Sequence, residues 1–300
     1  MIEGPSFVIG NIAKGEDLWN RQEEIESIWR ALPKGSILLK APRRFGKTSI
    51  MYNLYENPKM GFKVFYQDTE GMSEPQDLIS ALMTKLLLDS KLRNKLKPVT
   101  KWLKNIVGQI EEIGVADVRL KIKEGIKKDW KEKGLELIYN LTGHEEKILF
   151  LIDELPILVQ NITKRHGGEQ SAREFLHWFR GIRQMPELSQ TRWVVGGSIG
   201  IEHVLEKVGA GTKVINDFQI IRIGPFSKED GRTYVRKLLE SEGQIKQIPS
   251  EIIEKFLELI GSPIPYFIQI LIKESLYEMR RRKQKALNSE VIEKAYQEEV

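Results

Sequence analysis

The sequence predicts an α/β fold, in which helices flank a parallel β-sheet, followed by a domain made only of helices. Two short apolar runs, 36–40 and 147–153, have the composition of strands that are buried on both faces of a parallel sheet. Segments with helical spacing of apolar residues alternate with strand-like segments up to about residue 225. Only helical patterns follow. We therefore expect an α/β domain over 1–225 and a helical domain over 226–300.

The same patterns place the individual elements in order. The expected strands are 36–40, 62–67, 147–153, 192–196 and 219–223. The expected helices are 21–32, 47–56, 75–88, 129–141, 168–185, 228–241, 250–260, 265–283 and 289 to the end. Ser227 followed by Asp230 has the spacing of a helix start, because a serine oxygen accepts a hydrogen bond from an amide in the first turn.

The segment 98–127 interrupts this alternation. It is dense in lysine and glutamate and lies between two expected helices of the α/β domain. We interpret it as an insertion within that domain, because the strand pattern resumes after it. Apolar residues that alternate with polar ones near 115–122 predict a pair of short strands there.

The composition excludes several classes of function. The 300 residues include no cysteine, which rules out disulfides, cysteine-type zinc sites and a thiol nucleophile. The four histidines do not have the HExxH spacing of zinc hydrolases. No apolar run reaches the roughly 18–20 residues that span a bilayer, and no signal peptide is visible, so we expect a cytoplasmic protein without a membrane partner. The net charge of +5 permits an acidic partner without requiring one.

The strongest motif is the octapeptide Ala-Pro-Arg-Arg-Phe-Gly-Lys-Thr at 41–48. It matches the phosphate loop GxxxxGK[ST], with alanine in place of the first glycine, and it lies between an expected strand and an expected helix. Backbone amides of such a loop surround the phosphates, Gly46 permits a close approach, and the helix N-terminus adds a favourable dipole. The Lys47 ammonium would contact the β- and γ-phosphates, and the Thr48 hydroxyl would reach Mg²⁺.

The loop also has a simpler interpretation, a basic turn that happens to open a helix. The full octapeptide in a strand–loop–helix setting favours the phosphate loop. Arg43 and Arg44 either reach a phosphate or form salt bridges within the protein, and the sequence leaves both uses open. The candidate nucleotide-binding residues of the loop are Ala41, Pro42, Arg43, Arg44, Phe45, Gly46, Lys47, Thr48 and Ser49.

A second motif ends the apolar run at 147–153, where Asp153 and Glu154 follow the apolar residues. This is the Walker B pattern, in which Asp153 would hold Mg²⁺, directly or through water. Glu154 would act as the general base that polarises the attacking water. Asp-Glu after an apolar strand is also common as a strand-to-helix cap, but the phosphate loop upstream favours the catalytic interpretation.

A third candidate is Ser198, which follows the expected strand 192–196. Its place is similar to that of sensor 1 in additional-strand P-loop ATPases, where a polar side chain contacts the γ-phosphate or the lytic water. An ordinary Gly-Ser turn is the alternative.

Together these motifs resemble the P-loop ATPases of the STAND branch in archaea and bacteria, relatives of the AAA+ and Orc/Cdc6 ATPases. The residues that carry the resemblance are the loop at 41–49, the strand end at 150–154 and the segment 19–25. The last is similar to the family's F-x-x-R-E-x-E-L box, which packs under the adenine, so the resemblance implies that Arg21 lies near the nucleotide. It also implies ATP or ADP with Mg²⁺ as cofactors, and a helical domain that acts as a lid.

Three further features are judged against this family. The segment 261–266 resembles its G-x-P element, which implies that Pro265, or alternatively Pro263, meets the nucleotide; a helix-start proline is the simpler interpretation. AAA+ proteins usually carry an arginine finger after the sensor 1 strand, but 199–221 contains no arginine. Many relatives continue into a winged helix, and we expect that appendage to be missing here.

Our first functional expectation is an ATP-binding, Mg²⁺-dependent ATPase that works as a conformational switch and hydrolyses slowly alone. The second is a DNA-associated loader or transposition-type ATPase of Cdc6-like character, which the net charge and the basic run 280–285 favour. The third is a nucleotide-binding interaction protein with little hydrolysis. A protein partner, an oligomer and a bound nucleic acid all remain open.

Overall fold

The computed structural model describes residues 4–88, 115–142, 146–198, 200–243 and 248–299. Contacts divide the chain into two compact units. The sheet unit comprises 28–40 and 54–221, and the helical unit comprises 1–27, 41–53 and 222–300. This grouping puts the N-terminal segment and the phosphate loop with the C-terminal helices, whereas the sequence predicts one α/β domain up to residue 225.

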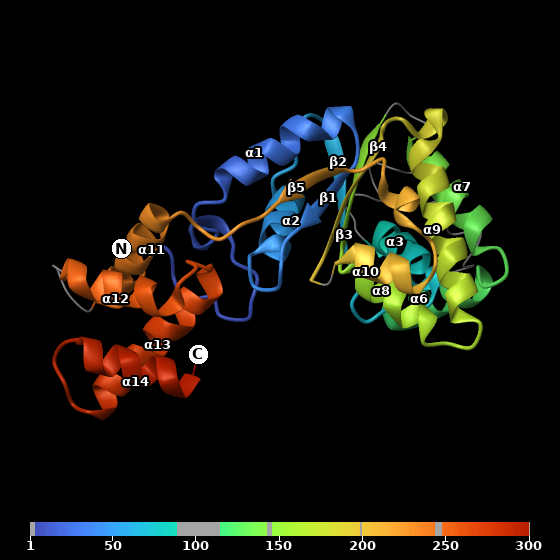
Figure 1. Cartoon of the computed structure of the whole chain (residues 1–300). Coiled ribbons are helices and arrows are strands. Elements are labelled where there is room, and N and C mark those ends of the chain that lie inside the picture. The colour runs from blue at the N-terminus through green and yellow to red at the C-terminus, as the bar shows by residue number, and fades with distance from the viewer. Residues whose placement is uncertain (1–3, 89–114, 143–145, 199, 244–247, 300) are drawn as a thin grey trace. The chain divides into compact units, whose positions relative to one another are not determined.

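A five-stranded sheet is the frame of the sheet unit (Figure 1). Its strands are β1 (Ile37–Lys40), β2 (Phe62–Asp68), β3 (Lys147–Asp153), β4 (Thr191–Gly197) and β5 (Gln219–Arg222). They lie in the order β2-β3-β4-β1-β5. The pairs β2/β3, β3/β4 and β1/β4 are parallel, so the carboxyl ends of these four strands share one edge.

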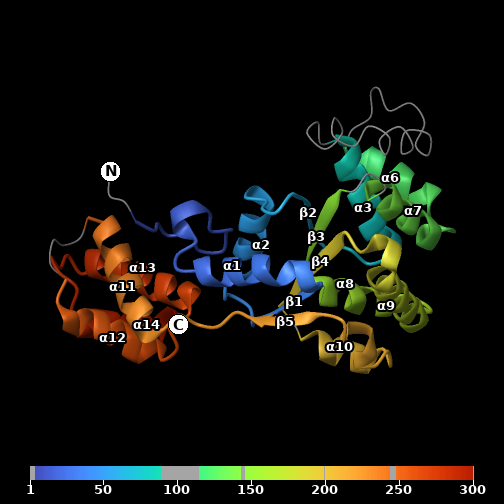
Figure 2. The same cartoon turned by 90° about the horizontal axis from the view of Figure 1, so that it is seen from above.

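Helices pack on this sheet. Those of the sheet unit are α3 (Pro75–Leu88), α6 (Val115–Gly125), α7 (Trp130–Thr142), α8 (Leu155–Thr163), α9 (Gly168–Gln184) and α10 (Ile201–Lys207). Figures 1 and 2 show α3, α7, α8 and α9 on the same side of the strands. Two further helices, α1 (Gln22–Ala31) and α2 (Lys47–Glu56), precede and follow β1. Short 3₁₀ helices cover Gly15–Asp17, Leu32–Lys34, Pro186–Leu188 and Thr212–Ile215.

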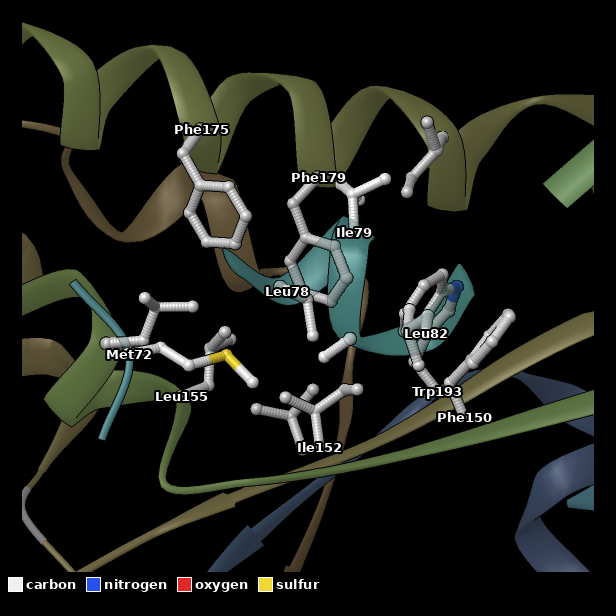
Figure 3. Close-up of a cluster of buried hydrophobic side chains, with 14 of the residues drawn as sticks. Met72, Leu78, Ile79, Leu82, Phe150, Ile152, Leu155, Phe175, Phe179 and Trp193 are labelled. Atoms are coloured by element: carbon white, nitrogen blue, oxygen red, sulfur yellow. The ribbon is translucent and has the colours of Figure 1, made fainter. Parts of the chain in front are cut away.

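The core of the sheet unit lies between the strands and α3, α8 and α9 (Figure 3). Phe150 of β3 stacks on Trp193 of β4 with ring centroids 4.4 Å apart, and Phe179 of α9 meets Trp193 edge-on at 4.9 Å. Such aromatic pairs contribute about 0.5–1.5 kcal/mol beyond the area they bury. This packing fixes the neighbouring strands β3 and β4, whose ends carry Asp153 and Ser198.

Four C-terminal helices form the second core, in the helical unit. They are α11 (Lys228–Ser241), α12 (Ser250–Ile260), α13 (Pro265–Arg281) and α14 (Ser289–Glu299). The N-terminal segment packs on this core, because Trp19 stacks on Tyr234 with ring centroids 6.1 Å apart. Buried Gln269 joins the two parts: its Nε2 donates to the Tyr234 hydroxyl at 2.7 Å, and its Oε1 accepts from the Val8 amide at 2.7 Å. Burial raises the pKa of Tyr234 to about 12, so the phenol stays neutral.

The start of α11 confirms the expected cap. The Asp230 amide donates to the Ser227 hydroxyl oxygen at 3.1 Å. We expect Ser227→Ala to lower the free energy of unfolding of the chain by about 1 kcal/mol, the usual cost of losing a serine cap. Urea unfolding measures the change. Ser250→Ala is the matched control, because Ser250 is the first residue of α12 and, among the described residues, no side chain caps the start of that helix. An equal loss in both variants would contradict the assignment.

The strand pair expected near 115–122 is wrong: Val115–Gly125 is the helix α6. Val118 and Ile122 are fully buried, four residues apart, whereas Leu120 between them is 57% exposed. The apolar residues therefore follow the helical period rather than the strand period. The rest of the expected insertion up to residue 114 lies outside the described residues. The sequence analysis missed the helices α8 and α10, because each is short and begins within a few residues of a strand end.

Among the described residues, no helix combines the length and the apolar character needed to cross a membrane.

Candidate functional site

Asp153 is the last residue of β3, at the edge of the sheet formed by the carboxyl ends of the strands, and it is only 2% exposed. Its surroundings fix the residue in place. The Thr69 amide and hydroxyl donate to the Asp153 carbonyl at 3.0 and 2.8 Å, and the Glu154 amide donates to Asp153 Oδ1 at 3.1 Å. A buried carboxylate held in this way is typical of a ligand for a cation.

Tyr66 adds a donor on the other carboxylate oxygen of Asp153. Its hydroxyl donates to Asp153 Oδ2 at 3.4 Å from the neighbouring strand β2. Burial, with further effects from the Asp153 and Asp68 charges, raises the pKa of Tyr66 well above its ordinary value. The phenol therefore stays protonated and remains a donor. The sequence analysis missed Tyr66, because only the β2/β3 register brings this side chain beside Asp153.

Two further acids, Asp68 at the last position of β2 and Glu70 just after it, make contacts of a turn. Asp68 pairs in register with Asp153, but its Oδ1 accepts the Glu70 amide at 2.9 Å. This is the local hydrogen bond of a turn. Both Asp68 and Glu70 are exposed.

Glu154 follows Asp153 and immediately precedes α8. Its backbone is left-handed, with φ of 57°, which is uncommon for a residue with a side chain. Its Oε2 accepts two hydrogen bonds from Ser198 on the neighbouring strand end, one from the amide at 2.7 Å and one from the hydroxyl at 2.9 Å. The structure thus brings together Asp153, Glu154 and Ser198, three residues that the sequence analysis selected from two separate motifs.

The phosphate loop follows β1, and the helix α2 begins at Lys47. Gly46 has a φ of +87°, a conformation that favours glycine. Lys47 is 6% exposed, and its Nζ donates to the Ala41 carbonyl at 3.3 Å, so the ammonium folds back over the loop. Thr48 is half-buried in the first turn, as the motif requires. The buried Ser49 accepts the Ala13 amide on its hydroxyl at 3.0 Å, so this serine joins the loop helix to the N-terminal segment.

The tip of the loop is exposed at Pro42, Arg43 and Arg44. Arg44 has a left-handed backbone with φ of 72°, and its guanidinium lies over the Tyr266 ring, 3.6 Å from the centroid. This cation–π contact joins the loop to the start of α13 within the helical unit. The sequence left open a phosphate contact or a salt bridge for Arg44, and this contact with an aromatic ring is neither of the two. Arg43 is exposed but not without contacts.

Arg21 lies just before α1 and is 3% exposed. Its guanidinium donates to the Gly224 carbonyl at 2.9 Å, to the Phe45 carbonyl at 3.3 Å and to Glu24 at 2.6 Å. It also lies over the Phe226 ring at 4.7 Å. Arg21 therefore fixes the backbone of the phosphate loop through Phe45.

The two candidate prolines occupy different positions. Pro265 is the first residue of α13, where a proline costs the helix no hydrogen bond. Pro263 is buried and packs against α11: a Cβ added at Gly231 would lie 2.9 Å from the Pro263 Cβ. Its carbonyl accepts the Phe226 amide at 3.0 Å. Pro263 thus serves packing, and Pro265 is the more accessible of the two.

We expect Arg21→Ala to lower the free energy of unfolding by about 2 kcal/mol, because hydrogen bonds from a charged donor are lost in a buried place. Urea unfolding measures this loss. Arg30→Ala removes an exposed arginine from the last turn of α1 and should change the free energy by less than about 0.5 kcal/mol. If Arg21→Ala unfolds with the same urea dependence as the wild type, these hydrogen bonds do not stabilise the chain.

The basic run 280–285 is largely engaged in ion pairs. Arg280 pairs with Glu242, Arg281 with Glu278, and Arg282 with Glu278 and Glu290. Arg281 and Arg282 lower the pKa of Glu278 to about 2. The three arginines of this run therefore join the end of α13 to Glu242 after α11 and to Glu290 of α14.

The fold belongs to a known class: the parallel sheet with its flanking helices is the AAA+ P-loop NTPase fold. The Aeropyrum pernix ORC2 protein in its ADPNP–ADP complexes is similar with a TM-score of 0.56 at 12% identity, over 94% of this chain and 68% of its own. Cdc6p from Pyrobaculum aerophilum is similar with a TM-score of 0.53 at 13% identity, over 95% of this chain and 68% of its own. The Aeropyrum pernix ORC1 protein in complex with DNA is similar with a TM-score of 0.50 at 15% identity, over 94% of this chain and 65% of its own.

This chain therefore spans about two thirds of the length of those proteins. No family model matches the sequence, and no curated protein matches it. At such low identities the likeness defines the fold, and the function has to be argued from the residues.

Proposed function

We propose that the chain is an ATP-binding, Mg²⁺-dependent ATPase that works as a nucleotide-controlled conformational switch, of the STAND type. The observation that supports it is the edge at which β3, β4 and β1 end. Lys40, the residue before the phosphate loop, pairs in register with Gly197 of β4. Asp153 ends the adjoining strand β3, and Glu154 follows it directly. Ligands of open parallel sheets bind beyond the carboxyl ends of the strands.

The residues present fit ATP with Mg²⁺. Lys47, Gly46 and the amides of the loop have the types and the local conformation that a phosphate chain needs. The Thr48 hydroxyl and the buried Asp153 carboxylate are the hard oxygen ligands that Mg²⁺ prefers. The bound ion would neutralise charge that develops on the β- and γ-phosphate oxygens.

We assign the remaining roles as follows. Glu154 accepts a proton from water while the water oxygen forms the new bond to the γ-phosphorus, and the bond to the leaving ADP oxygen breaks with its electron pair. Lys47 offsets the phosphate charge. Arg21 acts on the nucleotide through the backbone of Phe45, which it holds. Pro265, at the accessible start of α13, is the candidate contact from the lid.

The isolated chain should hydrolyse ATP slowly. The segment 199–221 contains no arginine, so it cannot supply an arginine finger to a neighbouring copy. A missing finger can cost about 10³–10⁵ in rate. The same absence favours an interaction protein with little hydrolysis, whereas Glu154, the base that we propose, favours an ATPase. ATPase assays over a range of protein concentrations distinguish these cases, and turnover that rises steeply with concentration would reveal an arginine acting from a second copy.

The switch is tested by small-angle scattering in ADP and in a non-hydrolysable ATP analogue. A ligand shifts a conformational equilibrium only by its differential affinity for the two states. ATP differs from ADP by the γ-phosphate, so we expect the analogue to favour a closed form in which the helical lid moves about the join near 224–225. Identical scattering profiles in the two nucleotides would contradict the switch.

A DNA-associated ATPase is the second candidate. The ORC1 protein of similar fold was solved in complex with DNA, and this chain carries a net charge of +5. The ion pairs of Arg280, Arg281 and Arg282 count against it, because these arginines already have carboxylate partners. Turnover measured with and without duplex DNA separates the candidates: a rate that is unchanged favours the switch, and a large increase favours the DNA-associated ATPase.

A further inference from the structure

The most developed side-chain contact at the sheet edge joins Glu154 to Ser198. Both Ser198 donors, the amide at 2.7 Å and the hydroxyl at 2.9 Å, meet the same oxygen, Oε2 of Glu154. Hydrogen bonds to an ionised acceptor are stronger than those between neutral groups. Two of them on one oxygen fix the rotation of the carboxylate and leave Oε1 as its second acceptor.

The backbone on both sides is shaped for this contact. The parallel register of β3 and β4 pairs Ile152 with Val195, so the carboxyl ends of the two strands lie next to each other. At Gly197 an added Cβ would lie 2.5 Å from Pro156 Cδ, closer than real Cβ atoms approach. Only glycine therefore lets the end of β4 approach the first turn of α8. On the other side, Glu154 adopts its left-handed φ of 57°, a conformation that persists only where the surroundings enforce it.

We infer that Ser198 is a positioning residue that acts through Glu154, holding the catalytic carboxylate with one oxygen anchored and the other presented to water. This inference rests on the proposed ATPase function. It differs from the sensor role expected from the sequence, in which the Ser198 side chain contacts the γ-phosphate or the water itself. Because the Ser198 hydroxyl donates to Glu154, removing this hydroxyl should lower the rate of hydrolysis. The relative affinity for ATP and ADP should stay unchanged.

The test begins with single-turnover hydrolysis and nucleotide affinities of the full chain. We expect Ser198→Ala to lower the hydrolysis rate about tenfold, because one of the two donors is removed and the amide remains. Ser198→Thr keeps a hydroxyl and should restore most of the rate. Ser171→Ala makes the same chemical change in the first turn of α9 and should leave the rate at the wild-type value. The affinities for ADP and for a non-hydrolysable ATP analogue should stay within about twofold in all three variants.

Repeating the Ser198→Ala substitution in a chain that lacks the Glu154 carboxylate shows whether Ser198 acts through Glu154 or directly on the nucleotide. In Glu154→Ala the carboxylate is absent, so adding Ser198→Ala should lower the residual rate by less than about twofold. A further tenfold loss in that background would overturn the inference, as would a selective loss of affinity for the ATP analogue in Ser198→Ala. A faster rate in Ser198→Ala would also overturn it, because the contact would then restrain the base.

These outcomes are distinct from failure of the proposed function. If the wild-type chain neither binds nor hydrolyses ATP with Mg²⁺, the ATPase proposal fails first. If the wild type hydrolyses ATP and the loss in Ser198→Ala persists without Glu154, the ATPase proposal stands and only the positioning role is wrong.

Discussion

Lys47→Ala is expected to lower the affinity for ATP by about 10–100-fold. The variant removes the ammonium that offsets phosphate charge, and a charge-assisted contact of this kind contributes about 1.5–3 kcal/mol. Lys47 is the first residue of α2, and its Nζ donates to the Ala41 carbonyl, so its side chain is already folded over the loop that would receive the phosphates. Calorimetric titration with ATP and Mg²⁺ measures the change.

The control for this variant is Lys131→Ala. Lys131 is a half-exposed lysine of α7 that pairs with Glu174 on the surface of the sheet unit, and the control should bind ATP as the wild type does. Undiminished affinity in Lys47→Ala would contradict the assignment of 41–48 as a phosphate loop. Equal losses in both variants would point to a general effect of net charge.

Glu154→Gln is expected to bind ATP almost as the wild type does and to hydrolyse it about 10²–10⁴-fold more slowly. The amide keeps the shape of the side chain and can still accept the Ser198 hydrogen bonds, but it does not take a proton from water. Phosphate release under saturating ATP and calorimetric affinity, measured on the same preparation, separate the two effects.

Glu174→Gln is the matched control for Glu154→Gln, because it makes the same change on the outer surface of α9. It should keep the wild-type rate. If Glu154→Gln also keeps that rate, Glu154 is not the base, and the exposed acids at the end of β2, Asp68 and Glu70, become the next candidates.

Most elements of the fold could be predicted because their periodicity is unambiguous. The bounds of α2, α3 and β3 coincide with the expected segments, since each has a clear apolar pattern and a marked boundary. The helix α2 begins at a lysine–threonine pair, α3 begins at a proline, and β3 ends at an aspartate. The segment 115–122 could not be assigned in the same way. Its apolar residues at positions 118, 120 and 122 satisfy the strand period, and only packing shows that position 120 faces solvent.

The candidate site could be predicted only where one local motif contains the chemistry. The phosphate loop and the Asp153–Glu154 pair are contiguous, so their residue types and order were sufficient. The contacts of Tyr66 with Asp153 and of Ser198 with Glu154 depend on strand neighbours that are distant in the sequence. The Arg44 contact with Tyr266 joins residues more than two hundred positions apart, and no local pattern signals it.

The central claim is that this chain binds ATP with Mg²⁺. Its most direct test is a calorimetric titration of the wild-type chain with ATP, in Mg²⁺ and in EDTA. The account predicts saturable binding of about one ATP per chain in Mg²⁺, competition by ADP, and weaker binding when the ion is withdrawn, because the phosphate charge would then lose the cation that offsets it. An absence of saturable binding at millimolar ATP with Mg²⁺ would contradict the account.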